Sequence, residues 1–262
     1  MTTPGVNVST FAPNLLSLQF EGPIAFLRLD DGKGNALGGA MLEAMGQALK
    51  EAEPKAQVLV ISGRERVFCG GLNLVELVRM DLAELRRFMQ LFDSVFRHLL
   101  SFQRPIVTVA RGAAIAGGAL LMCAGDDRLM APQGDIGVNE AAIGLSLPTS
   151  ALELLRVALG ERNATEAATW GRLYRDQERV RVGFATEVLA PEALDARARQ
   201  IATERSALDP VAVARIRARL RQPSLQRVEA HGAEDDALFL EQWFSQETQQ
   251  RIRAVVDRLT KK

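Results

Sequence analysis

The chain has 262 residues, in which 32 Lys and Arg balance 32 Asp and Glu. Its length fits one large domain, or one domain with a small appendage, and its 47% hydrophobic content fits a soluble protein with a sizeable core. The balanced charge argues against a nucleic-acid or anionic-membrane partner, and no apolar run is long enough to span a bilayer. Two cysteines and two histidines, without ligand spacing, lead us to expect no metal site.

The first seven residues show neither the basic and apolar regions of a secretory signal nor the Arg-rich character of a transit peptide. With only two cysteines, the default expectation is a cytosolic protein whose thiols stay reduced. We therefore expect a cytoplasmic protein.

The first third of the chain predicts a strand–helix–strand unit. Residues 14–29 predict a hairpin with its turn at 21–23, the apolar spacing over 39–53 predicts a helix, and 57–62 predicts a buried strand. A helix that joins two strands in this way makes a parallel, right-handed crossover.

The pattern then repeats. A long amphipathic helix is predicted over 82–101, followed by strands at 105–110 and 127–131. Glycine-rich stretches at 63–74 and 112–123 each follow a strand directly. Repeated crossovers predict a mainly parallel sheet of the α/β class, in which ligands bind at the carboxyl ends of the strands.

The C-terminal part is predicted to be helical. Pro148 opens a helix that runs to Leu159 with Gly160 as its C-cap, and further helices are predicted at 163–173, 191–206, 209–221 and 234–260. Four arginines alternate two by two in this part and cannot all share one helical face. This spacing favours a solvated helix over a phosphate-binding row; the residues are Arg215, Arg217, Arg219 and Arg221.

The two glycine stretches do not match nucleotide-binding motifs. A phosphate-binding loop needs Lys and then Ser or Thr after its last glycine, but Ala119 follows Gly118, and Gly112 and Gly117 are wrongly spaced for a dinucleotide fingerprint. Close packing of helix and strand is one interpretation of the small residues. The other is that each loop presents a backbone N–H to one oxygen, which makes an oxyanion hole.

An oxyanion hole serves acyl transfer or enolate formation. Acyl transfer needs a nucleophile beside a base, and no Ser stands at either loop, while Cys69 and Cys123 fit small buried hydrophobes. Enolate chemistry needs one base. Glu140 lies among apolar residues, where burial should raise its pKa toward neutrality. The alternative for Glu140 is a turn cap or an ion pair with Arg.

Three segments together resemble the crotonase, or enoyl-CoA hydratase/isomerase, superfamily: 68–74, 112–118 and 136–145. The resemblance implies a spiral of ββα crossover units, with a core over 1–195 that holds the acyl-CoA site and a helical oligomerisation region over 196–262. It implies an acyl-CoA thioester substrate and a homotrimer or hexamer. Coenzyme A is part of the substrate, so no separate cofactor is expected.

Mapped residue by residue, the resemblance assigns the oxyanion donors to the amides of Gly70 and Gly117, and the base to Glu140. It also implies that Lys33, Arg64 and Arg66 contact the CoA phosphates. The substrate-binding residues that it indicates are Lys33, Arg64, Arg66, Phe68, Gly71, Leu72, Asn73, Leu74, Leu120 and Asn139.

Members that hydrate enoyl-CoA carry a second carboxylate where this chain has Leu120. The chain therefore resembles the mitochondrial-type Δ3-Δ2-enoyl-CoA isomerases, although Asn73 and Gly70 stand where that branch usually has Asp and Ala. The alternatives are another one-carboxylate reaction, including a hydratase with a relocated acid such as Glu76 or Glu153, and a non-catalytic acyl-CoA-binding protein.

Overall fold

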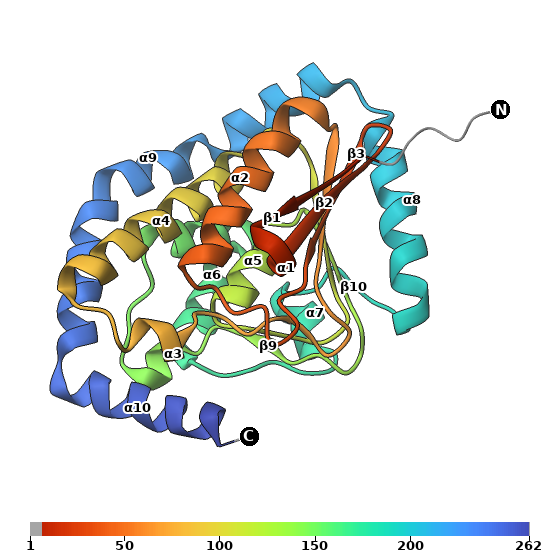
Figure 1. Ribbon diagram of the computed structural model, residues 1–262. Helices are drawn as coiled ribbons and strands as arrows, with labels where there is room; N and C mark the ends of the chain where they lie inside the picture. Colours follow the sequence, from red (N-terminus) through yellow and green to blue (C-terminus); the bar gives the residue numbers. More distant parts are fainter. Residues whose placement is uncertain (1–6, 262) are drawn as a thin grey trace.

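The computed structural model describes residues 7–261, in which the strands form two sheets (Figure 1). The large sheet has the spatial order β1 (Asn7–Phe11), β2 (Leu16–Glu21), β3 (Ile24–Leu29), β4 (Val58–Ser62), β6 (Ile106–Ala110), β8 (Asp127–Met130) and β10 (Glu187–Val188). The small sheet has the order β5 (Val67–Cys69), β7 (Ala113–Ile115) and β9 (Ile136–Gly137).

The pairing confirms the predicted hairpin and crossovers. Strands β1, β2 and β3 are antiparallel, whereas β3, β4, β6, β8 and β10 run parallel. Because β4 and β6 are parallel neighbours, the two glycine loops leave the large sheet at the same edge. Each loop then adds a short strand to the small parallel sheet, β5 beside β7.

The other regular elements of the described chain are helices. They are α1 (Ala12–Leu15), α2 (Gly39–Lys55), α3 (Leu74–Leu77), α4 (Leu82–Ser101), α5 (Gly117–Cys123), η1 (Glu140–Ile143), α6 (Thr149–Trp170), α7 (Glu178–Val182), η2 (Pro191–Ala193), α8 (Leu194–Ser206), α9 (Pro210–Phe244) and α10 (Gln246–Thr260). The prediction of α4 is confirmed, and Gly160 interrupts α6 with a positive φ of 76° near the predicted helix end.

The large sheet is covered on both faces. Along β4, Val58 and Val60 pack with α8, while Leu59 and Ile61 point into the main core. Figure 1 shows α8 on one side of the sheet and α2, α4 and α9 on the other. The alternation explains why this strand reads as a continuous apolar run in the sequence.

The C-terminal helices differ from the prediction. Helix α9 is continuous across the predicted gap at 222–233 and contains Pro223. Pro223 removes one backbone donor, but buried Ser224 and Val228 beside it stabilise the helix through tertiary packing. The break comes at Ser245, whose backbone is extended and whose hydroxyl caps α10.

The predicted boundary between 195 and 196 remains a prediction. Phe239, Trp243 and Ile252 from α9 and α10 belong to the same hydrophobic cluster as the strands and α4. Helix α9 packs along α4 and α6. The C-terminal helices are thus part of the main core as well as the end of the chain.

The arginines of α9 do not all face solvent. Arg215 and Arg219 are exposed, but Arg217 and Arg221 turn inward to Asp126. The expectation of a solvated helix is therefore wrong for Arg217 and Arg221, because residues four apart share the face that packs on the core.

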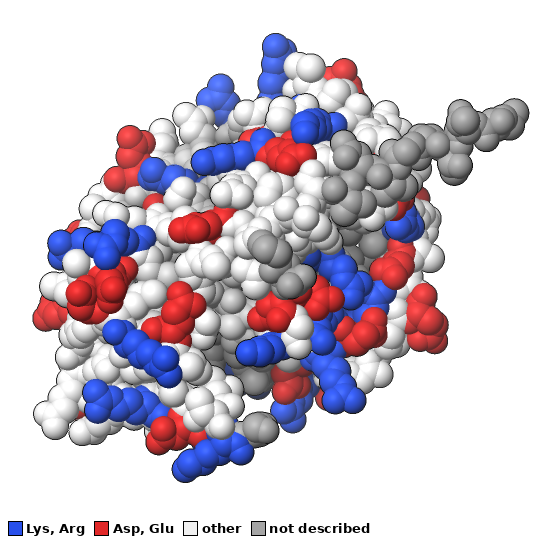
Figure 2. Space-filling model, in the orientation of Figure 1, with Lys and Arg blue, Asp and Glu red and all other residues white. Residues whose placement is uncertain are grey.

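The visible surface mixes both signs of charge. Basic and acidic side chains are interspersed on the face drawn in Figure 2. Over residues 7–261, the structure contains no helix with the length and apolar character needed to cross a membrane.

Candidate active site

The two glycine loops meet at the end of the small sheet. Gly71 has a φ of +89°, and a Cβ on it would lie only 2.8 Å from Ala116 Cβ and 2.8 Å from Ile115 O. Glycine is therefore required at position 71, both for the left-handed backbone and for the close approach. This contact confirms that the two loops face one place.

The backbone N–H groups of the first glycine loop differ in their hydrogen bonding. The Gly70 N–H already donates to the Gly34 carbonyl at 2.9 Å. This bond contradicts the expectation that Gly70 supplies an oxyanion donor. Within residues 7–261, the N–H groups of Leu72 and Gly117 have no acceptor.

The two free amides belong to adjacent segments. A Cβ on Gly117 would lie 3.6 Å from Gly71 Cα and 3.9 Å from the Gly71 carbonyl carbon, which is bonded to the Leu72 nitrogen. Leu72 is the residue that sequence reasoning assigned only to substrate contact. Gly34 decides which N–H of the loop stays free, because its carbonyl accepts from Gly70 and not from Leu72. No local sequence motif indicates that contact.

The turn before Gly117 is strained. Ala116 has φ 53° and ψ −122°, a conformation that residues with a Cβ rarely adopt. Its N–H donates to Gly137 O at 2.8 Å, and its carbonyl accepts from Ala119 at 2.8 Å. Strain of this kind persists only where the surroundings impose it, and it is typical of ligand-binding backbone.

Glu140 begins η1, three residues after the strand that pairs with the second loop. Ile115 and Gly137 are partners in the β7–β9 ladder, so Glu140 emerges beside the Ala116–Gly117 turn. The residue is only 7% exposed, and its Oε2 atom has no hydrogen-bond partner among the residues that the structure describes. Burial raises the pKa of Glu140 to about 7, although the amides of Glu140 and Asn139 oppose the shift.

This environment fits a general base. A carboxyl group that titrates near neutrality can both take and return a proton at physiological pH. The alternative that Glu140 pairs with an arginine is not supported, since no ion pair within residues 7–261 involves it. The predicted pKa shift is confirmed.

The C-terminal helix covers the segment that carries Glu140. Thr248 on α10 donates from its hydroxyl to Gly144 O at 3.2 Å. A Cβ on Gly144 would lie 2.9 Å from both Thr248 Oγ1 and Arg251 Nη1. Helix α10 therefore holds Gly144, the residue that follows η1, in place.

The candidate second carboxylates are engaged elsewhere. Leu120 is buried in α5, and it cannot transfer a proton. Glu76 accepts from Gly39 N–H at 3.0 Å and from Asn73 Nδ2 at 2.9 Å. Glu153 accepts two 2.7 Å bonds from Arg227; burial raises its pKa, but these bonds outweigh burial and the net shift is downward.

The predicted CoA contacts are only partly brought together. Arg64 donates to Lys33 O at 3.0 Å and pairs with Asp30 at 3.2 Å, near the Gly34–Gly70 contact. Exposed Arg66 precedes β5 and lies at the opposite end of that strand. The Phe68 side chain is fully buried and offers no surface to a substrate. Half-buried side chains near the site belong to Leu72, Asn73, Leu74 and Asn139.

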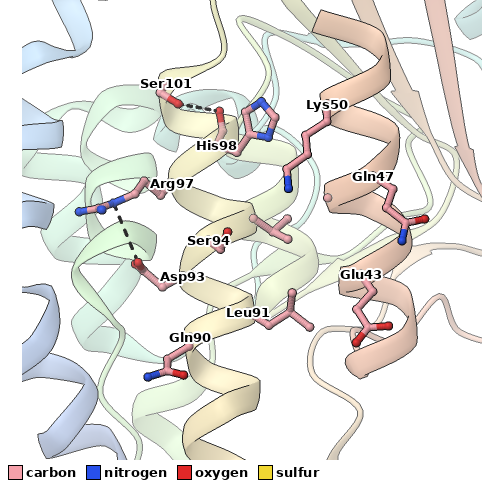
Figure 3. A pocket seen from close by; sticks show the side chains of 12 residues that line it. Glu43, Gln47, Lys50, Gln90, Leu91, Asp93, Ser94, Arg97, His98 and Ser101 are labelled. Atoms are coloured by element: carbon pink, nitrogen blue, oxygen red, sulfur yellow. Dashed lines mark hydrogen bonds and ion pairs between the residues drawn. The ribbon is translucent and has the colours of Figure 1, made fainter.

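An open groove of about 590 Å³ lies between α2 and α4 (Figure 3). Lys50 and Gln47 line it from α2, and Ser94 and His98 from α4. None of its lining residues belongs to the candidate site. The His98 Nε2 atom lies 3.0 Å from Glu53, and the His98 side chain is partly buried at the edge of the core.

Residues 19–260 match the family model described as enoyl-CoA hydratase/isomerase. The chain belongs to the enoyl-CoA hydratase/isomerase family. The crotonase fold predicted from the sequence is confirmed.

Relatives in this family carry both activities in their names. The chain is 26% identical over 204 residues to the short-chain-enoyl-CoA hydratase of Clostridium acetobutylicum, covering 76% of this chain and 78% of the relative. It is 27% identical over 201 residues to mitochondrial enoyl-CoA delta isomerase 1 of Mus musculus, covering 74% and 70%.

A solved structure matches almost the full length. Human mitochondrial Δ3-Δ2-enoyl-CoA isomerase superimposes with a TM-score of 0.87 at 22% identity, over 98% of both chains. At this identity, the likeness establishes the shared fold.

Proposed function

We propose that the chain is a Δ3-Δ2-enoyl-CoA isomerase that uses Glu140 as its single base. The observation that carries the proposal is the buried Glu140 carboxylate, with one free oxygen, just beyond the strand next to the free amides of Leu72 and Gly117. A base and an oxyanion hole are what an enolate intermediate requires.

In the proposed reaction, the thioester oxygen of a 3-enoyl-CoA accepts hydrogen bonds from Leu72 and Gly117. Glu140 takes a proton from C2, and the electron pair of that bond delocalises over the thioester and the double bond as a dienolate. Glu140 then returns the proton to C4, the double bond moves to C2–C3, and trans-2-enoyl-CoA leaves. The proton count is unchanged.

Leu120 favours isomerisation over hydration. Hydration needs one group to activate water and another to protonate carbon, and Glu76 and Glu153 already bind backbone and side-chain donors. A hydratase is the second candidate, supported by the hydratase names among the relatives.

We propose that a CoA thioester is the substrate and that the reaction needs no separate cofactor. We also propose that the protein is cytoplasmic. Lys33 and Arg64 are proposed to contact the CoA phosphates because they lie beside the Gly34–Gly70 contact. We also propose a homotrimer or hexamer. Exposed apolar side chains on and just before the first part of α9 support it: Leu208, Val211 and Ile216.

The test compares trans-3-hexenoyl-CoA with trans-2-hexenoyl-CoA, followed by mass and absorbance. The proposal predicts conversion of the 3-enoyl ester to the 2-enoyl ester without hydration of either. Addition of water to the 2-enoyl ester would instead establish a hydratase. Binding of both esters without turnover would favour the non-catalytic alternative.

A further inference from the structure

A second cavity lies at the other edge of the large sheet. It has a volume of about 550 Å³ and is lined by Asp126, Arg128, Arg217, Leu220 and Arg221, among others. Asp126 accepts a hydrogen bond from the N–H of Ile106, the first residue of β6, and Arg128 lies at the start of β8. The glycine loops leave the carboxyl ends of β4 and β6, so this cavity is separate from the candidate active site.

The cavity wall carries excess positive charge. The Arg128 guanidinium donates only to carbonyls, those of Gly125 at 2.7 Å, Gly183 at 2.9 Å and Ala158 at 3.3 Å. Within residues 7–261, its charge therefore has no carboxylate partner.

A single carboxylate serves the other two arginines. Asp126 pairs with Arg217 through Nη1 and with Arg221 through Nη2, the latter at 3.2 Å. The neighbouring pair of Arg205 and Asp127, 2.6 Å apart, is neutral by itself. Three guanidinium groups thus face one carboxylate, which leaves about two positive charges uncompensated in a partly dry place.

Two guanidinium nitrogens lack acceptors. Within residues 7–261, Arg217 Nη2 and Arg221 Nη1 are buried without a hydrogen-bond partner, and Arg221 is only 8% exposed. Burial lowers the pKa of Arg221, and Arg217 and Arg128 add to this effect against the opposing charge of Asp126. Buried donors without acceptors are costly, and they lie among guanidinium groups that carry more positive charge than Asp126 balances.

We propose that this cavity binds a doubly charged oxyanion of the phosphate class, either inorganic phosphate or a phosphate monoester. The planar guanidinium matches a phosphate oxygen pair, and the ligand charge would balance the excess on Arg128, Arg217 and Arg221.

The test is a calorimetric titration of the whole chain at constant ionic strength, with inorganic phosphate and, separately, phenyl phosphate as probes. Each titration is repeated with saturating hexanoyl-CoA. Binding of either probe that persists beside hexanoyl-CoA supports the proposal, and the two probes distinguish the free ion from a monoester. Failure of both to bind, or displacement by hexanoyl-CoA, overturns it.

Matched variants locate the site. Arg221→Met should weaken phosphate binding by about tenfold or more, because it removes one of the three positive charges that line the cavity. Arg219→Met removes the same charge from the exposed face of the helix and should change the affinity by less than about twofold. Equal losses in the two variants would show a diffuse surface effect and contradict the proposal.

A third variant should strengthen binding. Asp126→Asn removes the competing negative charge while its amide oxygen can still accept from Ile106 N–H. Tighter phosphate binding is expected, and unchanged or weaker binding in folded protein would contradict the proposal. Because this variant tests a gain of affinity, a folding defect cannot imitate the expected result.

Discussion

The Asn73 side-chain amide donates a 2.9 Å hydrogen bond to Oε2 of Glu76, whose Oε1 accepts from Gly39 N–H at 3.0 Å. On either side of Leu72, Asn73 N–H donates to Leu37 O at 3.1 Å and Leu37 N–H donates to Gly71 O at 2.8 Å. Together, the Asn73–Glu76 pair and these backbone bonds hold the segment around Leu72 against the start of α2. An aspartate at position 73 could not donate to Glu76.

Asn73→Asp should lower the free energy of unfolding by about 1.5–3 kcal/mol, because it replaces a hydrogen bond to a carboxylate with two facing carboxylates. Urea denaturation at pH 8 measures the change. Adding Glu76→Gln should restore much of the loss, since the side-chain amide that it introduces can donate to the new carboxylate at position 73. Equal stability of wild type and Asn73→Asp would refute the pairing.

Gly71→Ala should reduce kcat/KM by on the order of 10²-fold or more, because a Cβ there displaces the turn between the two free amides. Gly70→Ala is the control. Its Cβ would meet only Gly34 O at 3.3 Å, and its φ is not positive, so most activity should remain. Steady-state kinetics on trans-3-hexenoyl-CoA measure both; similar losses would contradict the geometry of the loops.

The rate should depend on the ionisation of Glu140. Because its pKa is raised to about 7, kcat/KM should rise with pH and reach half its plateau near pH 7. A profile that is flat from about pH 5.5 to about 8.5 would show that no group with this pKa acts as the base.

Stability should show the opposite dependence. The pKa of Glu140 is raised from 4.5 to about 7 on folding, so the native state holds the proton more tightly and loses stability as pH rises through this window. The loss amounts to about 3–4 kcal/mol at most. Denaturation of Glu140→Gln, which has no such proton, should lack this component; identical pH dependence in both proteins would contradict it.

Both thiols should be unreactive in the folded protein. Cys69 and Cys123 are buried, and burial raises the pKa of each to about 12. This confirms their interpretation as small buried hydrophobes. Iodoacetamide at pH 8 should modify neither in native protein and both in urea, as read by mass spectrometry. Rapid native labelling of either thiol would show that its surroundings open.

Periodic patterns made much of the fold predictable. The capping box between Asp81 and Glu84 marks the start of α4, and its apolar face repeats over 20 residues. By contrast, β9 has two residues and β7 three, too few for any period to appear. Their pairing depends on the two glycine loops meeting in three dimensions.

The place of the candidate site was predictable to the level of the glycine loops and the burial of Glu140, but the choice between individual amides was not. The choice between Gly70 and Leu72 is made by Gly34, which lies far away in the sequence and engages the first of them. Likewise, the inward turn of Arg217 and Arg221 depends on Asp126, about ninety residues earlier. Contacts of this range leave no local signal.

In the proposed reaction, the carboxylate of Glu140 alone moves the proton. The most direct measurement is single-turnover conversion of trans-3-hexenoyl-CoA in deuterated water by wild type and by Glu140→Gln, with hexanoyl-CoA binding measured in both. If Glu140 is the single base, Glu140→Gln should bind hexanoyl-CoA nearly as well as wild type but should neither shift the double bond nor exchange the C2 hydrogen. Full isomerisation by that variant would contradict it.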